Sequence, residues 1–177
     1  MLIAALISSR LCGVRAGATA RILARTLRDL RLPALSFAFV LALAYVMNAS
    51  GMTVCLGTFA THSGRAFPLL SPVLGWLGVF LTGSDTSSNV LFGGLQKTAA
   101  EQLGLNPILT AAANTSGGVL GKMISPQSLA VACAATGRVG DEGLLLRRTL
   151  GHSLLFLSFM SLLVYLQAFY LVGMVPA

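Results

Sequence analysis

The stretch Gly83-Ser84-Asp85-Thr86-Ser87-Ser88-Asn89 decides how this chain is interpreted, because it is a polar run between two apolar segments, 67–81 and the one that begins at Val90. Soluble domains carry about 25% charged residues, whereas only 10% of this chain is charged and 55% is hydrophobic. We therefore predict an all-α polytopic membrane protein with this run at membrane depth. Backbone groups there must be satisfied by protein or water, so a loop at that depth indicates a functional site.

The two apolar segments beside this run are too short to cross a membrane separately. Residues 67–81 would form a helix of about 23 Å, against a hydrocarbon core of about 30 Å. The second segment, 90–103, contains Lys97 and Glu101 four residues apart, a pairing typical of a hydrated helix end. Two short legs around a polar tip predict a re-entrant helical hairpin at about 67–103 that enters from the outer side and returns to it.

A second polar run, Asn114-Thr115-Ser116-Gly117-Gly118, interrupts the next apolar segment, which Ser125-Pro126 interrupts again. We predict a discontinuous transmembrane helix at about 107–137, broken at both places. A helix that begins just after a polar run directs its N-terminal N–H groups toward the run. Such helix ends favour a bound anion.

Nine of the twelve basic residues lie in two blocks, 10–31 and 138–148, and basic blocks between apolar segments mark cytoplasmic loops. This orientation predicts transmembrane segments at 33–50 and 150–172 and an outer loop at 51–66. Within the first block, Arg21, Arg25 and Arg28 would share one face of a helix lying on anionic lipid headgroups. A plain solvated loop explains the block equally well.

The net charge of +7 does not indicate nucleic acid, because the basic residues follow the pattern of membrane loops and no nucleic-acid recognition motif is present. Three cysteines, Cys12, Cys55 and Cys133, lie far apart and far from the two histidines, His62 and His152. The sequence therefore predicts no metal site and no cofactor. It also has no Ser-His-Asp arrangement, so an enzyme is not expected.

Two ionisable residues accompany the polar runs. An acid at membrane depth is a functional hypothesis by default, and Asp85 could carry a proton or ligate a cation. Lys122 could bind a substrate carboxylate or pair with Asp85. The alternative is that Asp85 only caps a helix and Lys122 reaches the membrane interface. Asp85 is the candidate for proton coupling, and the predicted substrate- or ion-binding residues are Ser84, Asp85, Thr86, Ser87, Asn89, Asn114, Thr115, Ser116, Gly117, Gly118 and Lys122.

Two long stretches carry a resemblance to a known family. Residues 81–93 (LTGSDTSSNVLFG) and 113–128 (ANTSGGVLGKMISPQS) resemble the C-terminal signature of bacterial L-lactate permeases, as does the stretch from Leu32 to Asn48. The similarity covers about residues 25–172. It implies a symporter for lactate and related 2-hydroxy monocarboxylates, glycolate among them, in the bacterial cytoplasmic (inner) membrane. Protons are the expected coupling ion rather than sodium.

The resemblance also implies an architecture. The wider ion-transporter superfamily has two inverted repeats, each with a re-entrant hairpin followed by a broken helix. Residues 1–177 would form a single membrane domain that is the C-terminal part of such a transporter. Besides the lipid bilayer and the monocarboxylate, the expected partners are the missing N-terminal half or further copies of the chain. The alternative function is a truncated, non-transporting remnant or subunit that needs a partner carrying the N-terminal half.

Overall fold

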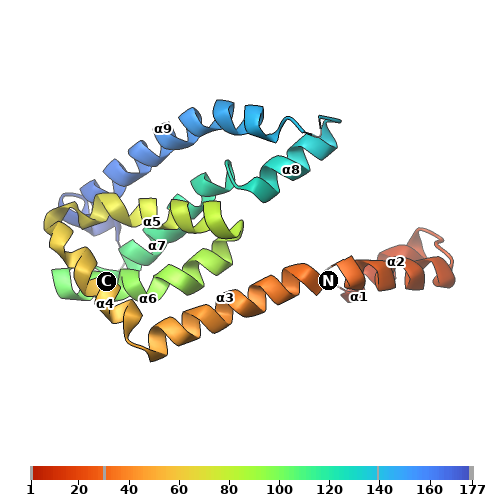
Figure 1. Cartoon of the computed structure of the whole chain (residues 1–177), viewed down its shortest axis with the longest axis horizontal. Helices are drawn as coiled ribbons and strands as arrows, with labels where there is room; N and C mark the ends of the chain where they lie inside the picture. The colour runs from red at the N-terminus through yellow and green to blue at the C-terminus, as the bar shows by residue number, and fades with distance from the viewer. Residues whose placement is uncertain (1, 30, 139, 176–177) are drawn as a thin grey trace. The chain divides into compact units, whose positions relative to one another are not determined.

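The computed structural model describes residues 2–29, 31–138 and 140–175, and these residues form helices without any strand. The predicted all-α class is confirmed (Figure 1). Contacts divide the chain into two units, residues 1–39 and 40–177. The helices in chain order are α1 (Leu2–Leu11), α2 (Ala16–Asp29), α3 (Arg31–Ala49), α4 (Met52–Ala60), the 3-10 helix η1 (Thr61–Ala66), α5 (Phe67–Thr82), α6 (Asp85–Leu103), α7 (Pro107–Lys122), α8 (Pro126–Ala135), α9 (Glu142–Phe169) and the 3-10 helix η2 (Val172–Met174).

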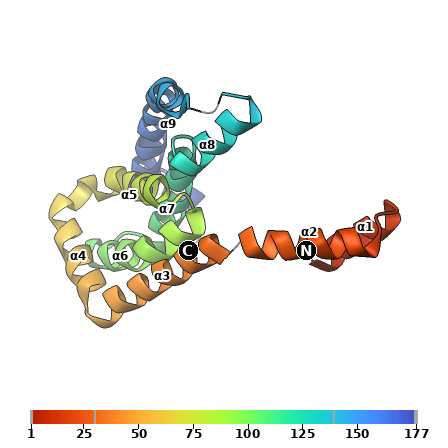
Figure 2. The same ribbon diagram turned by 45° about the vertical axis from the view of Figure 1, so that its right-hand side comes forward.

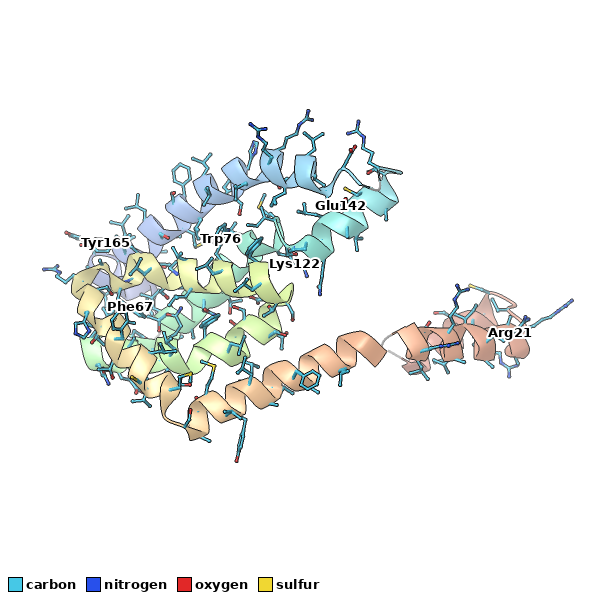
Figure 3. All side chains as sticks on the ribbon, viewed as in Figure 1. Arg21, Phe67, Trp76, Lys122, Glu142 and Tyr165 are labelled. Carbon is cyan, nitrogen blue, oxygen red and sulfur yellow. The ribbon has the colours of Figure 1, made fainter. Side chains whose placement is uncertain are left out.

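The first unit is built around the amphipathic helix α2. Ala20 and Leu23 face a cavity that they share with residues of α1. The arginines Arg21, Arg25 and Arg28 are exposed, and Figure 3 shows Arg21 extending away from the helix. The basic block expected as a cytoplasmic loop is therefore largely helical, because its small and apolar residues recur at helical spacing.

The second unit is organised around the helix pair α5–α6 and the helix α7. The two members of the pair are joined at Gly83–Ser84 and pack on each other, α7 packs on both, and α9 covers α5 and α7. Figures 1 and 2 both show α5 and α7 side by side, with α6 next to α7. On the other side α4 packs on α6, burying Thr53 and Gly57.

Glycines allow α5 and α7 to approach until their backbones touch. A Cβ atom added at Gly117 would overlap the Pro72 carbonyl, and one at Gly121 would overlap the Trp76 carbonyl. From the other helix, a Cβ atom at Gly75 would overlap the Asn114 carbonyl. Gly117 and Gly121 stand four residues apart, the small-xxx-small spacing with which membrane helices pack closely.

Three expectations about local structure are wrong. The run Asn114–Gly118 lies inside the continuous helix α7 and breaks nothing, because its side chains and glycines serve the contacts with α5 and α6. The second predicted break, at Ser125-Pro126, is present between α7 and α8, at 123–125. The second leg of the hairpin, expected to begin at Val90, begins as α6 at Asp85, because Ser84 caps the helix there. The predicted outer loop 51–66 is helical, in α4 and η1, because the apolar sequence of α4 packs on α6.

Among the described residues, two helical segments are long and apolar enough to cross a membrane, 52–82 and 142–169. The second begins before the predicted segment 150–172 and includes Arg147 and Arg148. Helix α3 coincides with the predicted segment 33–50. The membrane depth of α3 and of the α5–α6 pair stays a prediction.

Candidate functional site

The turn between α5 and α6 satisfies its own backbone groups. Gly83 ends α5 with φ 67°, a conformation that glycine adopts without strain, and its N–H donates to the Val79 carbonyl at 2.7 Å. Ser84 is the N-cap of α6, and its hydroxyl accepts from the Ser87 N–H at 3.3 Å. The Thr82 hydroxyl accepts from the Ser84 N–H at 3.2 Å. The polar residues at this turn therefore replace the helix bonds that the break removes.

Pro126 causes the interruption between α7 and α8. Proline has no N–H to donate to the Lys122 carbonyl, and it disfavours helical geometry in the residue before it. Ser125 is accordingly extended, with ψ 137°, and its hydroxyl accepts from the Ser128 N–H at 3.4 Å. The Lys122 carbonyl accepts from the Ser125 N–H at 3.3 Å instead. The chain thus leaves one helix and starts another within three residues, 123–125.

The interruption between α7 and α8 lies beside the α5–α6 turn, at Gly83. The Lys122 ammonium donates to the Gly83 carbonyl, and the Gln127 side chain of α8 lies where a Cβ atom of Gly83 would be. Because Ser84 caps α6 and Gln127 belongs to the first turn of α8, the N-terminal ends of both helices lie beside this glycine. Lys122 is on the last turn of α7, near the α8 junction, as Figure 3 shows.

Asp85 lies in the same place and has an unsatisfied oxygen. Its Oδ1 atom is buried and has no hydrogen-bond partner within the described residues, and it contacts the position that a Cβ atom of Gly118 would occupy. An open cavity of about 390 Å³ is lined by Asp85, Gly118, Val119, Lys122 and Met123. A carboxyl group and an ammonium group therefore border one cavity, although the ammonium is bonded to a neutral carbonyl.

The charged side chains of α5–α8 other than Asp85 and Lys122 pair with each other. Residues 67–137 contain four charged residues, Asp85, Lys97, Glu101 and Lys122. Lys97 and Glu101 are exposed and pair with each other at 3.7 Å. The part of the chain that the structure describes contains no group of three or more His, Cys, Asp or Glu side chains that could hold a metal ion. The arrangement can exchange a proton at Asp85 and bind an anion at Lys122.

A second polar group lies deeper, at the interface of α5, α6 and α7. The Asn89 Oδ1 atom accepts from Asn114 Nδ2 at 2.7 Å and from the Thr115 hydroxyl at 3.2 Å. Gln96 Nε2 donates to Asn114 Oδ1 at 3.2 Å and to the Ser71 carbonyl at 2.9 Å. Since Gln96, Asn114 and Ser71 are fully buried, these bonds hold the three helices in register rather than offer a vacant site.

The predicted site residues therefore divide between two places. Asp85, Gly118 and Lys122 line the cavity, with Ser84 and Ser87 in the adjoining helix cap. Asn89, Asn114 and Thr115 belong to the interhelical network, and Gly117 packs on Pro72. Thr86 is exposed and Ser116 half-buried. Asn89 also interacts with the Asp85 carboxyl group one turn earlier, which connects the two places.

Four residues that take part in these two places are absent from the predicted set, namely Ser71, Gln96, Thr110 and Gln127. Gln96 is next to Lys97 and close to Glu101, in a segment whose charges predict a hydrated helix end. The available signal was the spacing of Asn89 and Gln96, seven residues apart, which places both on one face of a helix. Gln127 directly follows a proline at the start of a helix, and its proximity to Gly83 depends on tertiary structure.

Comparison with known proteins identifies the family. The family model described as L-lactate permease matches residues 1–171. Glycolate permease GlcA of Escherichia coli (strain K12) is 55% identical over 172 residues, covering 97% of this chain and 31% of that protein. L-lactate permease of Salmonella typhi is 51% identical over 176 residues, covering 99% of this chain and 32% of its own length. L-lactate permease of Bacillus subtilis (strain 168) is 48% identical over 176 residues, with 99% and 31% covered.

No solved structure matches the chain. The chain spans about a third of the length of these relatives. The matches extend through the apolar helices, the Gly83–Asp85 turn and the 114–122 segment, and all three proteins are named as permeases. The resemblance inferred from the two long stretches is therefore confirmed, and so is the expectation of a transporter family rather than an enzyme family. This chain belongs to the L-lactate permease family.

Proposed function

We propose that this chain takes part in secondary transport of L-lactate and related 2-hydroxy monocarboxylates such as glycolate across the bacterial cytoplasmic membrane, coupled to protons. The observation that carries the proposal is the meeting of Lys122, Asp85 and two helix N-termini at Gly83. An ammonium group and helix N-termini favour a carboxylate. A carboxyl group with an unpartnered oxygen favours a proton.

The chemistry assigns a role to each part. The substrate carboxylate binds the Lys122 ammonium, close to the first turns of α6 and α8, and Asp85 carries the coupling proton. In the membrane, the α5–α6 pair forms the re-entrant hairpin and α7–α8 the broken helix, with the blocks 10–31 and 138–148 on the cytoplasmic side. This is the arrangement in which secondary transporters bind substrates at broken helices.

One observation favours the alternative, a chain that transports only with a partner carrying the N-terminal half. Beside the charged residues of the cavity, Val119 is 59% exposed and Met123 is 37% exposed. An apolar wall next to a binding cavity is the surface that a second half of the transporter would cover.

A graft tests both functions. Residues 1–171, the range that the family model matches, replace the corresponding part of the Escherichia coli glycolate permease in a strain unable to take up lactate or glycolate. The chain is also expressed alone. We expect the graft to take up labelled L-lactate and glycolate when the outside is more acidic. Uptake by the graft but not by the chain alone identifies a chain that needs a partner half. Failure of a graft that is present in the membrane in normal amount contradicts the transport role.

The same graft tests the coupling role of Asp85. Asp85→Asn removes the titrating group while keeping its size, so accumulation driven by the pH gradient is expected to be lost. Undiminished accumulation would remove Asp85 from the coupling step. Lys97→Gln, at an exposed lysine outside the cavity, is the control and is expected to transport normally.

A further inference from the structure

We infer that Lys122 is shared between Asp85 and the substrate carboxylate, so that Asp85 must take up its proton before the monocarboxylate binds. This inference rests on the proposed function and adds an order of binding to it. The starting point is the position of the lysine. Its ammonium is bonded to the neutral Gly83 carbonyl, while the carboxyl group of Asp85 borders the same cavity with one oxygen unsatisfied.

Within residues 40–138 and 140–175, no ion pair or hydrogen bond links another charged side chain to Asp85 or Lys122. Helix α5 carries no charged residue, and the other charged residues of α6, Lys97 and Glu101, are paired with each other and exposed. Helix α8 has no charged residue, and its Cys133 lines a different cavity. On α9, which packs on α5 and α7, the basic residues Arg147, Arg148 and His152 are exposed. Its one acid, Glu142, accepts from the Gly140 N–H at 3.2 Å. Asp85 therefore has the Asn89 side chain as a neutral partner, and Lys122 is the charged residue that lines its cavity.

Lys122 has three possible acceptors of unequal strength. A carboxylate attracts the ammonium with a full opposite charge, whereas a neutral carbonyl offers only a dipole, so the carboxylate is the stronger acceptor. An ionised Asp85 would therefore draw the ammonium away from the Gly83 carbonyl. The observed bond to that carbonyl fits a protonated Asp85, whose carboxyl group no longer competes. In that state the lysine keeps its charge and is available to a carboxylate ligand.

The sum of charges explains why proton and substrate would cross together. With Asp85 ionised and the cavity empty, the carboxylate and the Lys122 ammonium cancel. Protonation of Asp85 leaves one uncompensated positive charge, which binding of a monocarboxylate cancels again. Uncompensated charge is costly at membrane depth. The empty state and the fully loaded state are thus neutral. The state that carries only the proton has a net positive charge, so its passage through the membrane is disfavoured until the anion binds.

The pairing is tested by a double-mutant cycle that does not depend on transport. Melting temperatures of the purified wild-type protein, Asp85→Asn, Lys122→Gln and the double variant are measured without substrate from about pH 4 to about pH 9. If Asp85 and Lys122 pair, the shift in melting temperature of the double variant should differ from the sum of the two single shifts by at least about 2 °C at high pH. At low pH the shifts should add. The exposed pair Lys97–Glu101, replaced by glutamines in the same way, is the matched control. Absence of coupling at high pH overturns the inference.

The order of binding is tested by adding L-lactate, with its neutral amide as the control ligand. Wild-type protein is expected to bind lactate at low pH and weakly at high pH, whereas Asp85→Asn should bind it well at both. Lys122→Gln should lose about tenfold or more in affinity at every pH, the equivalent of one charge-assisted hydrogen bond. The amide should stabilise no variant.

The remaining outcomes separate the order of binding from the transport role. If Asp85→Asn keeps the wild-type pH dependence of lactate binding, the order of binding is overturned while the transport role stands. If lactate and glycolate bind no variant at any pH and the graft does not transport, both are overturned. A variant whose melting temperature is normal in the absence of ligand has folded, so its loss of binding counts as a result.

Discussion

At the scale of single residues, Gly117 shows how the unit containing the cavity is held together. Its Cα lies against the Pro72 carbonyl, one turn before Gly121 meets the Trp76 carbonyl. The Trp76 indole N–H in turn donates to the Ser153 hydroxyl of α9 at 2.8 Å, and that hydroxyl donates to the Leu120 carbonyl at 2.8 Å. Backbone contact and hydrogen bonds therefore hold the same interface together. A side chain added at Gly117 or Gly121 would overlap a backbone carbonyl of α5.

The first prediction concerns this contact. Gly117→Ala places a methyl group against the backbone carbonyl of Pro72, which cannot move aside as a flexible side chain would. Overpacking of this kind costs about 1–3 kcal/mol, and we expect a lower melting temperature. Gly93→Ala is the control, because a Cβ atom there meets nothing within 4 Å. Since alanine favours helix formation, that variant should be neutral or slightly more stable, and equal destabilisation of both would contradict the contact.

At the scale of helices, the sequence predicted the position of the α5–α6 turn, because glycine and serine at a helix boundary have few other uses between apolar segments. It placed the next helix at Val90, whereas α6 already begins at Asp85. The run at Asn114 has a similar composition but stays helical. Its Asn114 amide bonds to Asn89 of α6, and its glycine Gly117 packs on α5. Composition cannot distinguish a polar break from a polar interface. That distinction depends on Gln96 and Asn89, which lie on another helix.

The same limit applies to the candidate site. Asp85 and Lys122 could be identified from the sequence because charges are rare in residues 67–137. Their shared cavity could not, because it depends on the close approach of Gly118 to Asp85 across two helices. Gln96 was missed because it is buried while its neighbour Lys97 is exposed. Neighbouring helical residues differ by about 100° in direction, so only packing decides which of them is inside.

The second prediction concerns helix α2. Its three arginines Arg21, Arg25 and Arg28 share one exposed face, and each is worth about 1 kcal/mol near an anionic membrane surface. A peptide of residues 14–31 should bind phosphatidylglycerol vesicles about 100-fold more tightly than its three-glutamine version, as measured by helix formation in circular dichroism. A three-lysine version is the control and should keep the binding. Equal affinity for anionic and zwitterionic vesicles would favour the plain solvated segment.

At the scale of the whole molecule, the cysteines supply a test of the proposed orientation. Cys12 and Cys55 are exposed, and Cys133 is buried. The arginine blocks predict Cys12 on the cytoplasmic side, and one crossing by α3 then puts Cys55 on the outer side. These positions follow from charge and parity, and they do not depend on how the two units are arranged.

The third prediction therefore uses versions of the protein that keep one cysteine, with serine at the other two positions. A membrane-impermeant maleimide should label Cys55 in intact cells and Cys12 in inverted vesicles. Cys133 should react only after denaturation. Labelling of Cys12 and Cys55 from the same side would mean that the segment between them does not cross the membrane, and the orientation proposed from the arginine blocks would be wrong.

The glycine contact between α5 and α7 also limits how the protein can move. Backbones that touch cannot slide past each other, because a shift along the axis would drive a carbonyl into the next Cα. These two helices must therefore travel as one rigid body during any change of conformation. The displacement has to occur where side chains form the interface, as between α7 and α9 or between α4 and α6. Because Gly118, Val119 and Lys122 belong to α7, this side of the cavity would move together with α5.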